Sequence, residues 1–315
     1  MRKEKIVIGS RASKLALIQS NWTKSELETR FSGLDVIIKE ISTKGDRITD
    51  VPLSRLGGVG LFTKELENSL LSGEIDIAVH SAKDMPSELP EGLAIGAFPK
   101  REDSHDVFIG REGVSLDQIS ADCVIGTSSL RRKAQLLARF PDLKIEDLRG
   151  NLDTRLEKLK NGNFDGIILA NAGLIRMGLG EIARQIIPFD FMLPAVGQGS
   201  LAIETRQDDD DTLSMVSLLN DRTTRIAVTA ERSLLHKLQG GCQIPVGAAG
   251  EVCADGQLRL TAMVSSLDGT EIVKESAEGD VENASSIGLE LAELLLGKGA
   301  DKILREIRES LAQSS

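Results

Sequence analysis

Short apolar runs alternate with stretches of helical periodicity along the first two-thirds of the chain, and this alternation restricts the fold more than any other feature. Eight runs are expected to form strands: residues 5–9, 36–41, 75–79, 93–98, 107–109, 124–126, 144–148 and 166–170. Helical periodicity covers residues 13–30, 61–72, 129–140 and 152–161. This order is typical of α/β folds with mixed, largely parallel sheets, in which ligands bind at the carboxyl ends of strands and at helix N-termini.

The length of the chain predicts more than one domain, because 315 residues exceed one ordinary core. Residues 99–104 are expected to cross to a second lobe and residues 194–199 to cross back, so that residues 201–204 rejoin the first lobe as a strand. From residue 222 one helix, three strands and two helices are typical of a small α+β domain. The predicted division is domain 1 (residues 1–99 and 200–217), domain 2 (residues 105–193) and domain 3 (residues 222–315).

Composition and charge exclude several classes of protein. A net charge of −10, 3% aromatic residues and no tyrosine argue against a nucleic-acid surface. No apolar run is long enough to span a membrane, and no signal peptide is recognised, so a cytoplasmic location is expected. Three cysteines without Cys-x-x-Cys spacing predict neither a disulfide framework nor a zinc site. The three histidines also lack metal-ligand spacing and are expected to be structural, so no metal is expected.

Positive charge gathers in one part of this acidic chain. The hydroxyl residues 127–129 open a predicted helix and are followed by Arg131 and Arg132. Free N–H groups at a helix start favour an anion, and arginine adds paired hydrogen bonds to a carboxylate or phosphate. Ordinary helix capping with solvated arginines would give the same pattern. Because Arg149 and Arg155 flank a second helix start in the same lobe, we favour a site for a small polyanion.

Asp84 follows a predicted buried strand and lies in a loop between Lys83 and Pro86. A carboxylate in this position can stabilise a developing positive charge or move a proton. A turn-forming aspartate or a structural ion pair would look the same in the sequence.

Cys242 lies in a loop between two glycines and Pro245, a setting that presents a thiol to a ligand. A lone cysteine is, however, usually a small buried apolar residue, so the loop alone leaves both interpretations open.

Seven segments, in a consistent order over nearly the whole chain, resemble the porphobilinogen deaminase family: residues 10–16, 61–66, 80–86, 126–132, 148–151, 193–199 and 240–245. The resemblance implies two lobes similar to periplasmic binding proteins and a third domain that carries a cysteine. It also implies a transferase of tetrapyrrole and heme biosynthesis. Four porphobilinogen molecules would be joined head to tail, with loss of ammonia, onto a covalent dipyrromethane primer, and water would release hydroxymethylbilane. A monomer is expected.

The resemblance also implies roles for individual residues. Asp84 would be the catalytic residue, and Cys242 would hold dipyrromethane through a thioether. Further cofactor-binding residues would be Lys83, Ser81, Ser13, Thr127, Ser128, Ser129, Arg131, Arg132, Arg149, Gly150 and Gly173. Substrate-binding residues would be Arg11, Gln19, Phe62, Arg149, Arg155, Arg176 and Gln198. Val59 departs from many relatives, which have lysine there, so the contribution of that cation is in doubt in this chain.

Two other functions are compatible with parts of this pattern. A non-catalytic two-lobed binding protein for a small polycarboxylate would account for the lobes and the arginines, but not for Cys242 or the third domain. An enzyme acting on nucleotides or phosphosugars would also use arginines and glycine loops. The chain, however, has neither a P-loop nor a dinucleotide fingerprint.

Overall fold

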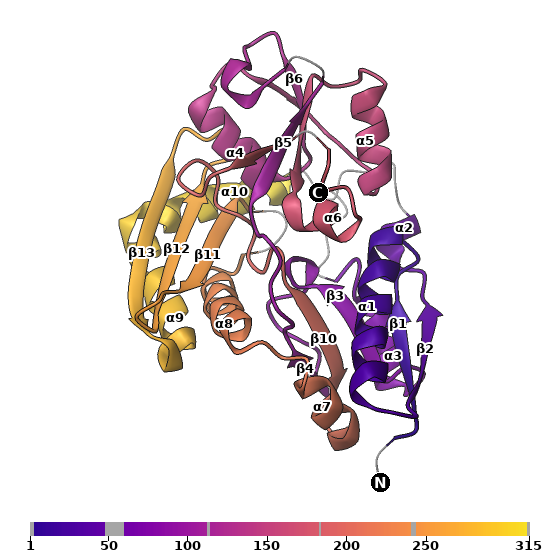
Figure 1. Ribbon diagram of the computed structural model, residues 1–315. Coiled ribbons are helices and arrows are strands. Elements are labelled where there is room, and N and C mark those ends of the chain that lie inside the picture. Colours follow the sequence, from indigo (N-terminus) through magenta and orange to yellow (C-terminus); the bar gives the residue numbers. More distant parts are fainter. Residues whose placement is uncertain (1–2, 48–59, 112–113, 183, 241–243, 314–315) are drawn as a thin grey trace.

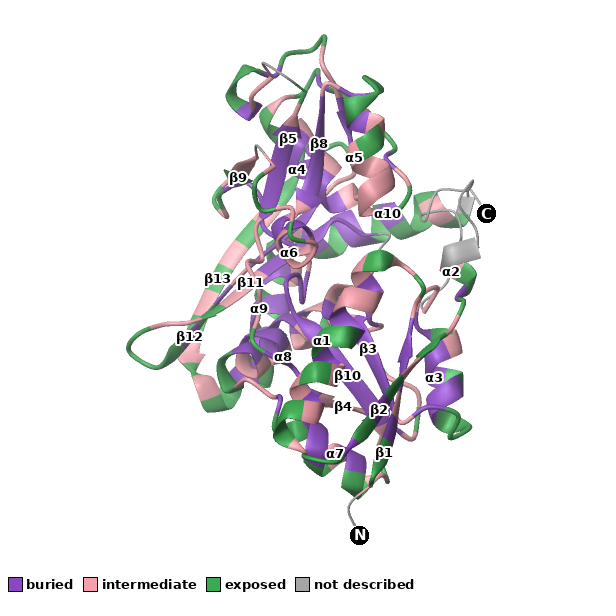
Figure 2. Cartoon of the chain, turned by 45° about the vertical axis from the view of Figure 1, so that its right-hand side comes forward, coloured by how far each residue is buried: buried purple, intermediate pink, exposed green. Residues whose placement is uncertain are grey.

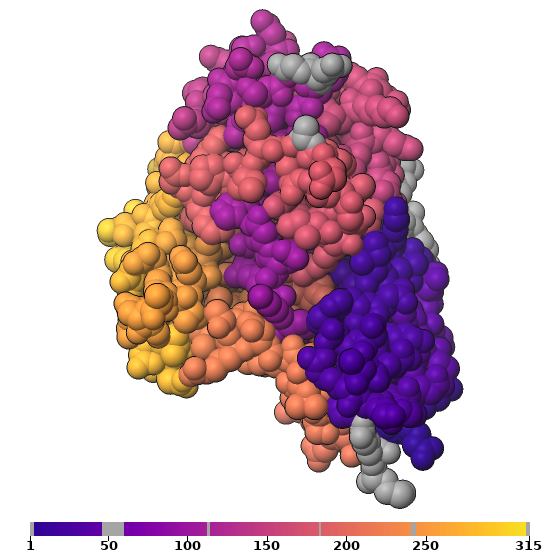
Figure 3. Space-filling view, viewed as in Figure 1, coloured from indigo at the N-terminus to yellow at the C-terminus, as the bar shows by residue number. Residues whose placement is uncertain are grey.

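The computed structural model describes residues 3–47, 60–111, 114–182, 184–240 and 244–313. These residues form three sheets with their helices, which make up two α/β lobes and a smaller C-terminal part (Figure 1). In the space-filling view the N-terminal residues and the C-terminal residues lie on opposite sides, below a cap made by the middle of the chain (Figure 3). Among the described helices, none is both long and apolar enough to cross a membrane. The expected fold class is confirmed.

Lobe 1 is built on a mixed sheet with strand order β2-β1-β3-β10-β4. Its strands are β1 (Lys5–Ser10), β2 (Asp35–Glu40), β3 (Ile77–Ser81), β4 (Leu93–Ala97) and β10 (Leu201–Arg206). Strand β1 runs parallel to β2 and β3, whereas β10 is antiparallel to β3 and β4. The accompanying helices are α1 (Lys14–Arg30), α2 (Lys44–Arg47), α3 (Lys64–Leu71), α7 (Asp210–Ser217) and the short 3₁₀ helix η1 (Ala82–Asp84). Strand β10 thus brings the chain back to this sheet after residue 200.

Lobe 2 has a second mixed sheet, with strand order β7-β6-β8-β5-β9. Its strands are β5 (Asp106–Gly110), β6 (Val124–Gly126), β7 (Lys144–Glu146), β8 (Gly166–Ala170) and β9 (Gln185–Ile187). Its helices are α4 (Leu130–Arg139), α5 (Leu152–Lys160), α6 (Asn171–Arg176) and the 3₁₀ helix η2 (Leu116–Gln118). Strand β6 is parallel to β7 and β8, whereas β5 is antiparallel to β8 and β9. In both lobes the interior antiparallel strand next to one edge, β10 or β5, is the first strand after a crossing, and its burial is visible in Figure 2.

The C-terminal part is a three-stranded antiparallel sheet in the order β11-β12-β13, packed against helices. Its strands are β11 (Val246–Val252), β12 (Gln257–Ser265) and β13 (Ile272–Asp280). Its helices are α8 (Arg222–Lys237), η3 (Val281–Asn283), α9 (Ala284–Leu295), the π-helical segment Leu296–Ala300 and α10 (Asp301–Gln313). Along strand β13 exposed residues alternate with half-buried ones, so the strand forms no apolar run in the sequence.

A buried carboxylate connects the C-terminal part to both crossings. Glu231 on α8 is fully buried and receives both terminal nitrogens of Arg101, at 2.6 and 3.1 Å. Its oxygens also accept the backbone N–H groups of Gly197 (2.7 Å) and Gly250 (2.8 Å). Since Arg101 belongs to the first crossing and Gly197 to the second, one side chain holds both connections between the lobes against α8.

Replacing Glu231 with alanine should lower the free energy of unfolding by about 3–5 kcal/mol, because Arg101 would be left with a buried, unpaired charge. Urea unfolding followed by circular dichroism measures this change. Glu290→Ala, at an exposed position on α9, is the matched control and should leave the free energy nearly unchanged. Equal stability of the two variants would contradict the structural role of Glu231.

Candidate active site

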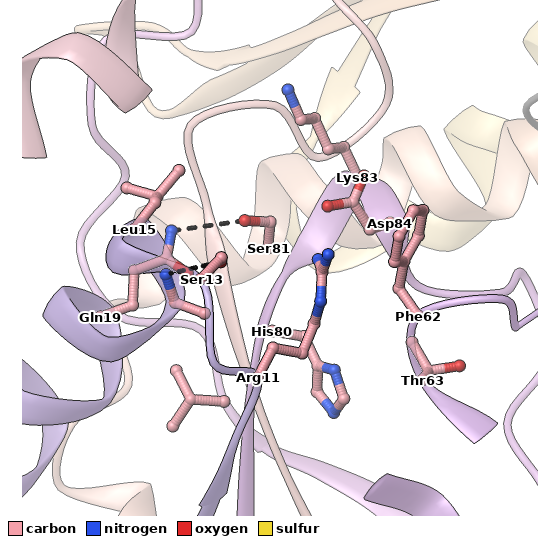
Figure 4. A pocket seen from close by; sticks show the side chains of 12 residues that line it. Arg11, Ser13, Leu15, Gln19, Phe62, Thr63, His80, Ser81, Lys83 and Asp84 are labelled. Carbon is pink, nitrogen blue, oxygen red and sulfur yellow. Dashed lines mark hydrogen bonds between the residues drawn. The ribbon is translucent and has the colours of Figure 1, made fainter. Parts of the chain in front are cut away.

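The first half of the site lies at the carboxyl ends of β1 and β3 in lobe 1. Strand β1 ends at Ser10 and β3 ends at Ser81, so the residues that follow them share one edge of the sheet. A pocket at this edge is lined by Arg11, Ser13, Leu15, Ala16, Gln19, Phe62, Thr63, Val79, His80, Ser81, Lys83 and Asp84 (Figure 4). The structure therefore brings together seven of the predicted site residues, which come from three separate segments of the chain.

Contacts between side chains shape this pocket. Ser13 caps α1 by accepting the N–H of Ala16 at 3.4 Å. The amide nitrogen of Gln19 donates to the hydroxyl of Ser81 at 3.3 Å, which joins α1 to the end of β3. The guanidinium carbon of Arg11 lies 4.2 Å from the centre of the Phe62 ring, a cation–π contact. Figure 4 shows the Arg11 guanidinium pointing toward the side of the pocket where Lys83 and Asp84 lie.

In lobe 2, the hydroxyl residues at the start of α4 bind to backbone groups. Ser129 is the N-cap and accepts the N–H of Arg132 at 3.4 Å. Ser128 donates to the carbonyl of Leu148 at 3.0 Å, and Thr127 accepts the N–H of Ser129 at 3.2 Å. These hydroxyls therefore stabilise the helix start, as the capping interpretation of the sequence predicted.

Asp106, the first residue of β5, lies between the two arginines of α4. Its carboxylate accepts Arg131 Nη1 at 2.7 Å, Arg132 Nη2 at 2.7 Å and the side-chain amide of Gln198 at 2.9 Å. Burial alone would raise the pKa of Asp106, but the charges of Arg131 and Arg132 outweigh it and hold that pKa well below its usual range. The sequence analysis missed Asp106, although a carboxylate at the start of a buried strand is itself a signal.

Arg155 and Arg149 add uncompensated positive charge to the same region. The Nε of Arg155 donates to the carbonyl of Gly150 at 2.9 Å, and Gly150 has a φ of 109°, which favours glycine. Burial, together with the nearby charges of Arg132 and Arg149, lowers the pKa of Arg155 to about 10, although Asp84 opposes the shift. Within the described part of the chain, Arg149 Nη1 is buried and has no hydrogen-bond partner.

Lys83 connects the charges of the two lobes. Burial lowers the pKa of Lys83 to about 8. The positive charges of Arg131 and Arg132 add to this shift, whereas the negative charges of Asp84 and Asp106 oppose it. The ammonium group of Lys83 in lobe 1 therefore interacts electrostatically with the buried charges of lobe 2. The cations around Asp84 and Asp106 outnumber these two carboxylates.

Two of the predicted residues lie where α6 meets other segments. Arg176 donates through Nη2 to the carbonyl of Gly199 at 2.6 Å, and burial lowers the pKa of Arg176. Gly173 lies on α6, where an added Cβ would come within 3.1 Å of Leu152 and 3.9 Å of Leu15 on α1. These two positions thus lie at the junction of the lobes and do not line the pocket.

The donor set fits a polycarboxylate ligand such as dipyrromethane. Buried guanidinium groups in excess over carboxylates, with one orphaned guanidinium nitrogen on Arg149, provide hydrogen bonds that only an added acceptor would satisfy. Two of the residues named in the sequence analysis, Cys242 and Val59, lie outside the described residues.

Amine labelling should detect the lowered pKa of Lys83. We expect the labelling rate of the peptide that contains Lys83 to reach half its maximum near pH 8, since the deprotonated amine is the reactive form. The protein for this test carries Cys242→Ser, so that no group is attached at residue 242. Peptide mass spectrometry follows the reaction, and Lys83→Arg identifies the labelled position. A rate that rises only in the ordinary lysine range, about pH 10, would contradict the shift.

Comparison with known proteins identifies the family of this chain. Residues 6–214 match the family model "Porphobilinogen deaminase, dipyromethane cofactor binding domain", and residues 225–297 match "Porphobilinogen deaminase, C-terminal domain". The porphobilinogen deaminase of Brevibacillus brevis is 52% identical over 301 residues, covering 95% of this chain and 96% of that protein. That of Chlorobaculum parvum is 49% identical over 311 residues, covering 98% and 99%.

Solved structures with a similar arrangement are far more distant. The periplasmic VFT2 domain of Bordetella pertussis BvgS shares 17% identity at a TM-score of 0.40, over 69% of this chain and 86% of that domain. An ancestral arginine-binding protein bound to glutamine shares 13% identity at a TM-score of 0.37, over 70% of this chain and 91% of that protein. The two family models and the near full-length relatives show that the chain belongs to the porphobilinogen deaminase family.

Proposed function

We propose that this porphobilinogen deaminase works through Asp84 as its catalytic carboxylate and through Cys242 as the attachment point of its dipyrromethane cofactor. The observation that carries the first assignment is that Asp84 is the only carboxylate among the described residues that line the pocket. The second rests on the resemblance around Cys242. Membership of the family also removes the alternative of a non-catalytic binding protein.

The role of Asp84 follows from the charge that develops on porphobilinogen. When ammonia leaves the methylene carbon of the substrate, the positive charge that remains is shared with the pyrrole nitrogen. A carboxylate that accepts a hydrogen bond from the pyrrole N–H stabilises this charge as it forms. Asp84 lies on η1, directly after β3. A position on a regular element suits a group that must act on each successive substrate molecule.

The cations hold the acidic side chains of the pyrrole rings. A charge pair 4 Å apart contributes about 4 kcal/mol near a protein surface, so several pairs can retain a multiply charged chain. We assign Lys83, Ser13, Ser81, Thr127, Ser128, Ser129, Arg131, Arg132, Arg149, Gly150 and Gly173 to cofactor binding. We assign Arg11, Gln19, Phe62, Arg149, Arg155, Arg176 and Gln198 to substrate binding. When bound, dipyrromethane supplies the pyrrole carbon to which the first substrate molecule is joined.

We also propose a division into three domains, at residues 1–99 with 200–217, 105–193 and 222–315. One sheet in each part and the gap between the two family matches, at residues 215–224, support this division. We also propose that the protein is a cytoplasmic monomer, as the resemblance to the family implies. Sedimentation equilibrium that gave the mass of a dimer would contradict the monomer.

Intact-protein mass spectrometry tests the attachment to Cys242. The purified protein should carry extra mass equal to two deaminated porphobilinogen units, located on the peptide that contains Cys242. Cys242→Ser should lack this mass, whereas Cys253→Ser, at a partly exposed free thiol, should keep it. An unmodified wild-type protein with full activity would refute the attachment.

Replacing Asp84 with alanine should lower kcat by about 100-fold or more, because the developing charge loses its stabilising partner. The mass of the cofactor should still be present, since the cations that hold it are unchanged. Initial-rate assays with porphobilinogen measure the effect. Asp35→Ala, at an exposed aspartate of β2 in the same lobe, serves as the control. Near-normal turnover by Asp84→Ala would overturn its assigned role.

A further inference from the structure

A second buried carboxylate lies in the sheet of lobe 1, behind the pocket. Glu204 on β10 is 0% exposed, and its Oε2 lies 2.9 Å from Nε2 of His80 on β3. Its other oxygen, Oε1, has no hydrogen-bond partner within the described part of the chain. Burying a carboxyl group with so few partners costs free energy. The contact with His80 is therefore important in offsetting the cost of burying Glu204.

His80 connects this carboxylate to the start of the turn that carries Asp84. The antiparallel pairing places Ala202 opposite His80 and Ala78 opposite Glu204, so the two polar side chains emerge on the same face of the sheet. His80 is 5% exposed, lines the pocket and is followed by Ser81 and η1. The contact between Nε2 of His80 and Oε2 of Glu204 holds the imidazole ring in one orientation.

Arg232 on α8 holds the segment that follows the turn. Its Nη2 donates to the carbonyls of Pro86 at 2.7 Å and Ser87 at 3.2 Å. Burial lowers the pKa of Arg232, and the negative charge of Glu204 opposes that shift. The charges of Glu204 and Arg232 therefore attract each other, although no direct ion pair joins them.

Glu67 on α3 is a second buried carboxyl group near Glu204. It is 6% exposed, and burial raises its pKa, with the negative charge of Glu204 contributing. Glutamine has nearly the shape of a protonated glutamic acid, so the two positions offer a matched pair of substitutions.

We propose that Glu204 is a positioning residue for the reaction: its contact with His80, together with the hydrogen bonds of Arg232 to Pro86 and Ser87, fixes both ends of the turn that carries Asp84. The proposal rests on the role of Asp84 proposed above. A carboxylate that must meet each pyrrole N–H in turn needs a fixed position, because a misplacement of about 1 Å can lower the rate about 100-fold.

The test compares Glu204→Gln with Glu67→Gln in the cofactor-loaded enzyme. We expect Glu204→Gln to lower kcat about 10- to 100-fold with little change in KM, since the groups that bind the substrate carboxylates are untouched. Glu67→Gln should keep kcat within about twofold, because the contact of His80 with Glu204 is retained in this variant. Near-normal kcat in Glu204→Gln, or equal losses in the two variants, would overturn the proposal.

A spectroscopic measurement separates positioning from general loss of stability. The chain has three histidines, so the ring-nitrogen NMR signals of His80 can be assigned with His80→Asn. These signals should move in Glu204→Gln and stay unchanged in Glu67→Gln. Unchanged His80 signals in Glu204→Gln would count against the proposal whatever the kinetics.

A third variant keeps the proposal open to refutation if Glu204→Gln folds poorly. Arg232→Gln removes the hold on Pro86 and Ser87 from a partly exposed position, and it should also lower kcat with little change in KM. Normal kcat in Arg232→Gln would overturn the proposal. The variant Asp84→Ala distinguishes a failure of the role proposed for Asp84 from a failure of the role proposed for Glu204. If it stays active, the proposed function fails; if it is inactive while Glu204→Gln is normal, only the positioning role fails.

Discussion

The buried interaction of Asp106 with two arginines determines the geometry of the site. One carboxylate at the start of β5 orients Arg131 and Arg132 of α4, and it also accepts a hydrogen bond from Gln198 in the return crossing. Without it, two guanidinium groups would be buried without an opposite charge, which is strongly unfavourable. Because one negative charge meets two positive ones, the cluster keeps a net positive charge. This remaining charge is what a polycarboxylate ligand can neutralise.

Buried carboxylates perform a related task at three places in the structure. Asp106 orients the cations of lobe 2, Glu231 holds both crossings against α8, and Glu204 pairs with His80 behind the pocket. In each case the acid lies on a regular element and binds a segment from a different part of the chain. An overall charge of −10 therefore coexists with a positive site, because the arginines are gathered and oriented while most acids remain on the surface.

Much of the fold could be predicted from local patterns. The eight strands expected in the first two-thirds are all present, with ends displaced by at most two residues, because buried strands read as continuous apolar runs. Helix α6 and strand β9 were missed, since six and three residues are too short to show a period. The family resemblance implied that Arg11, Gln19, Ser81, Lys83 and Asp84 belong to one site, and they line one pocket because the ends of parallel strands share an edge of the sheet.

Residue type and order were sufficient for the α/β class, the chain's return to lobe 1 and the choice of Asp84 and the arginines as candidates. They could not show that Arg131 and Arg132 bind Asp106, that Glu231 connects three segments, or that Glu204 lies behind the pocket. Each of these depends on a contact between residues far apart in the sequence. Local periodicity records which face of an element is buried, but the partner of a buried charge is set by how whole elements pack.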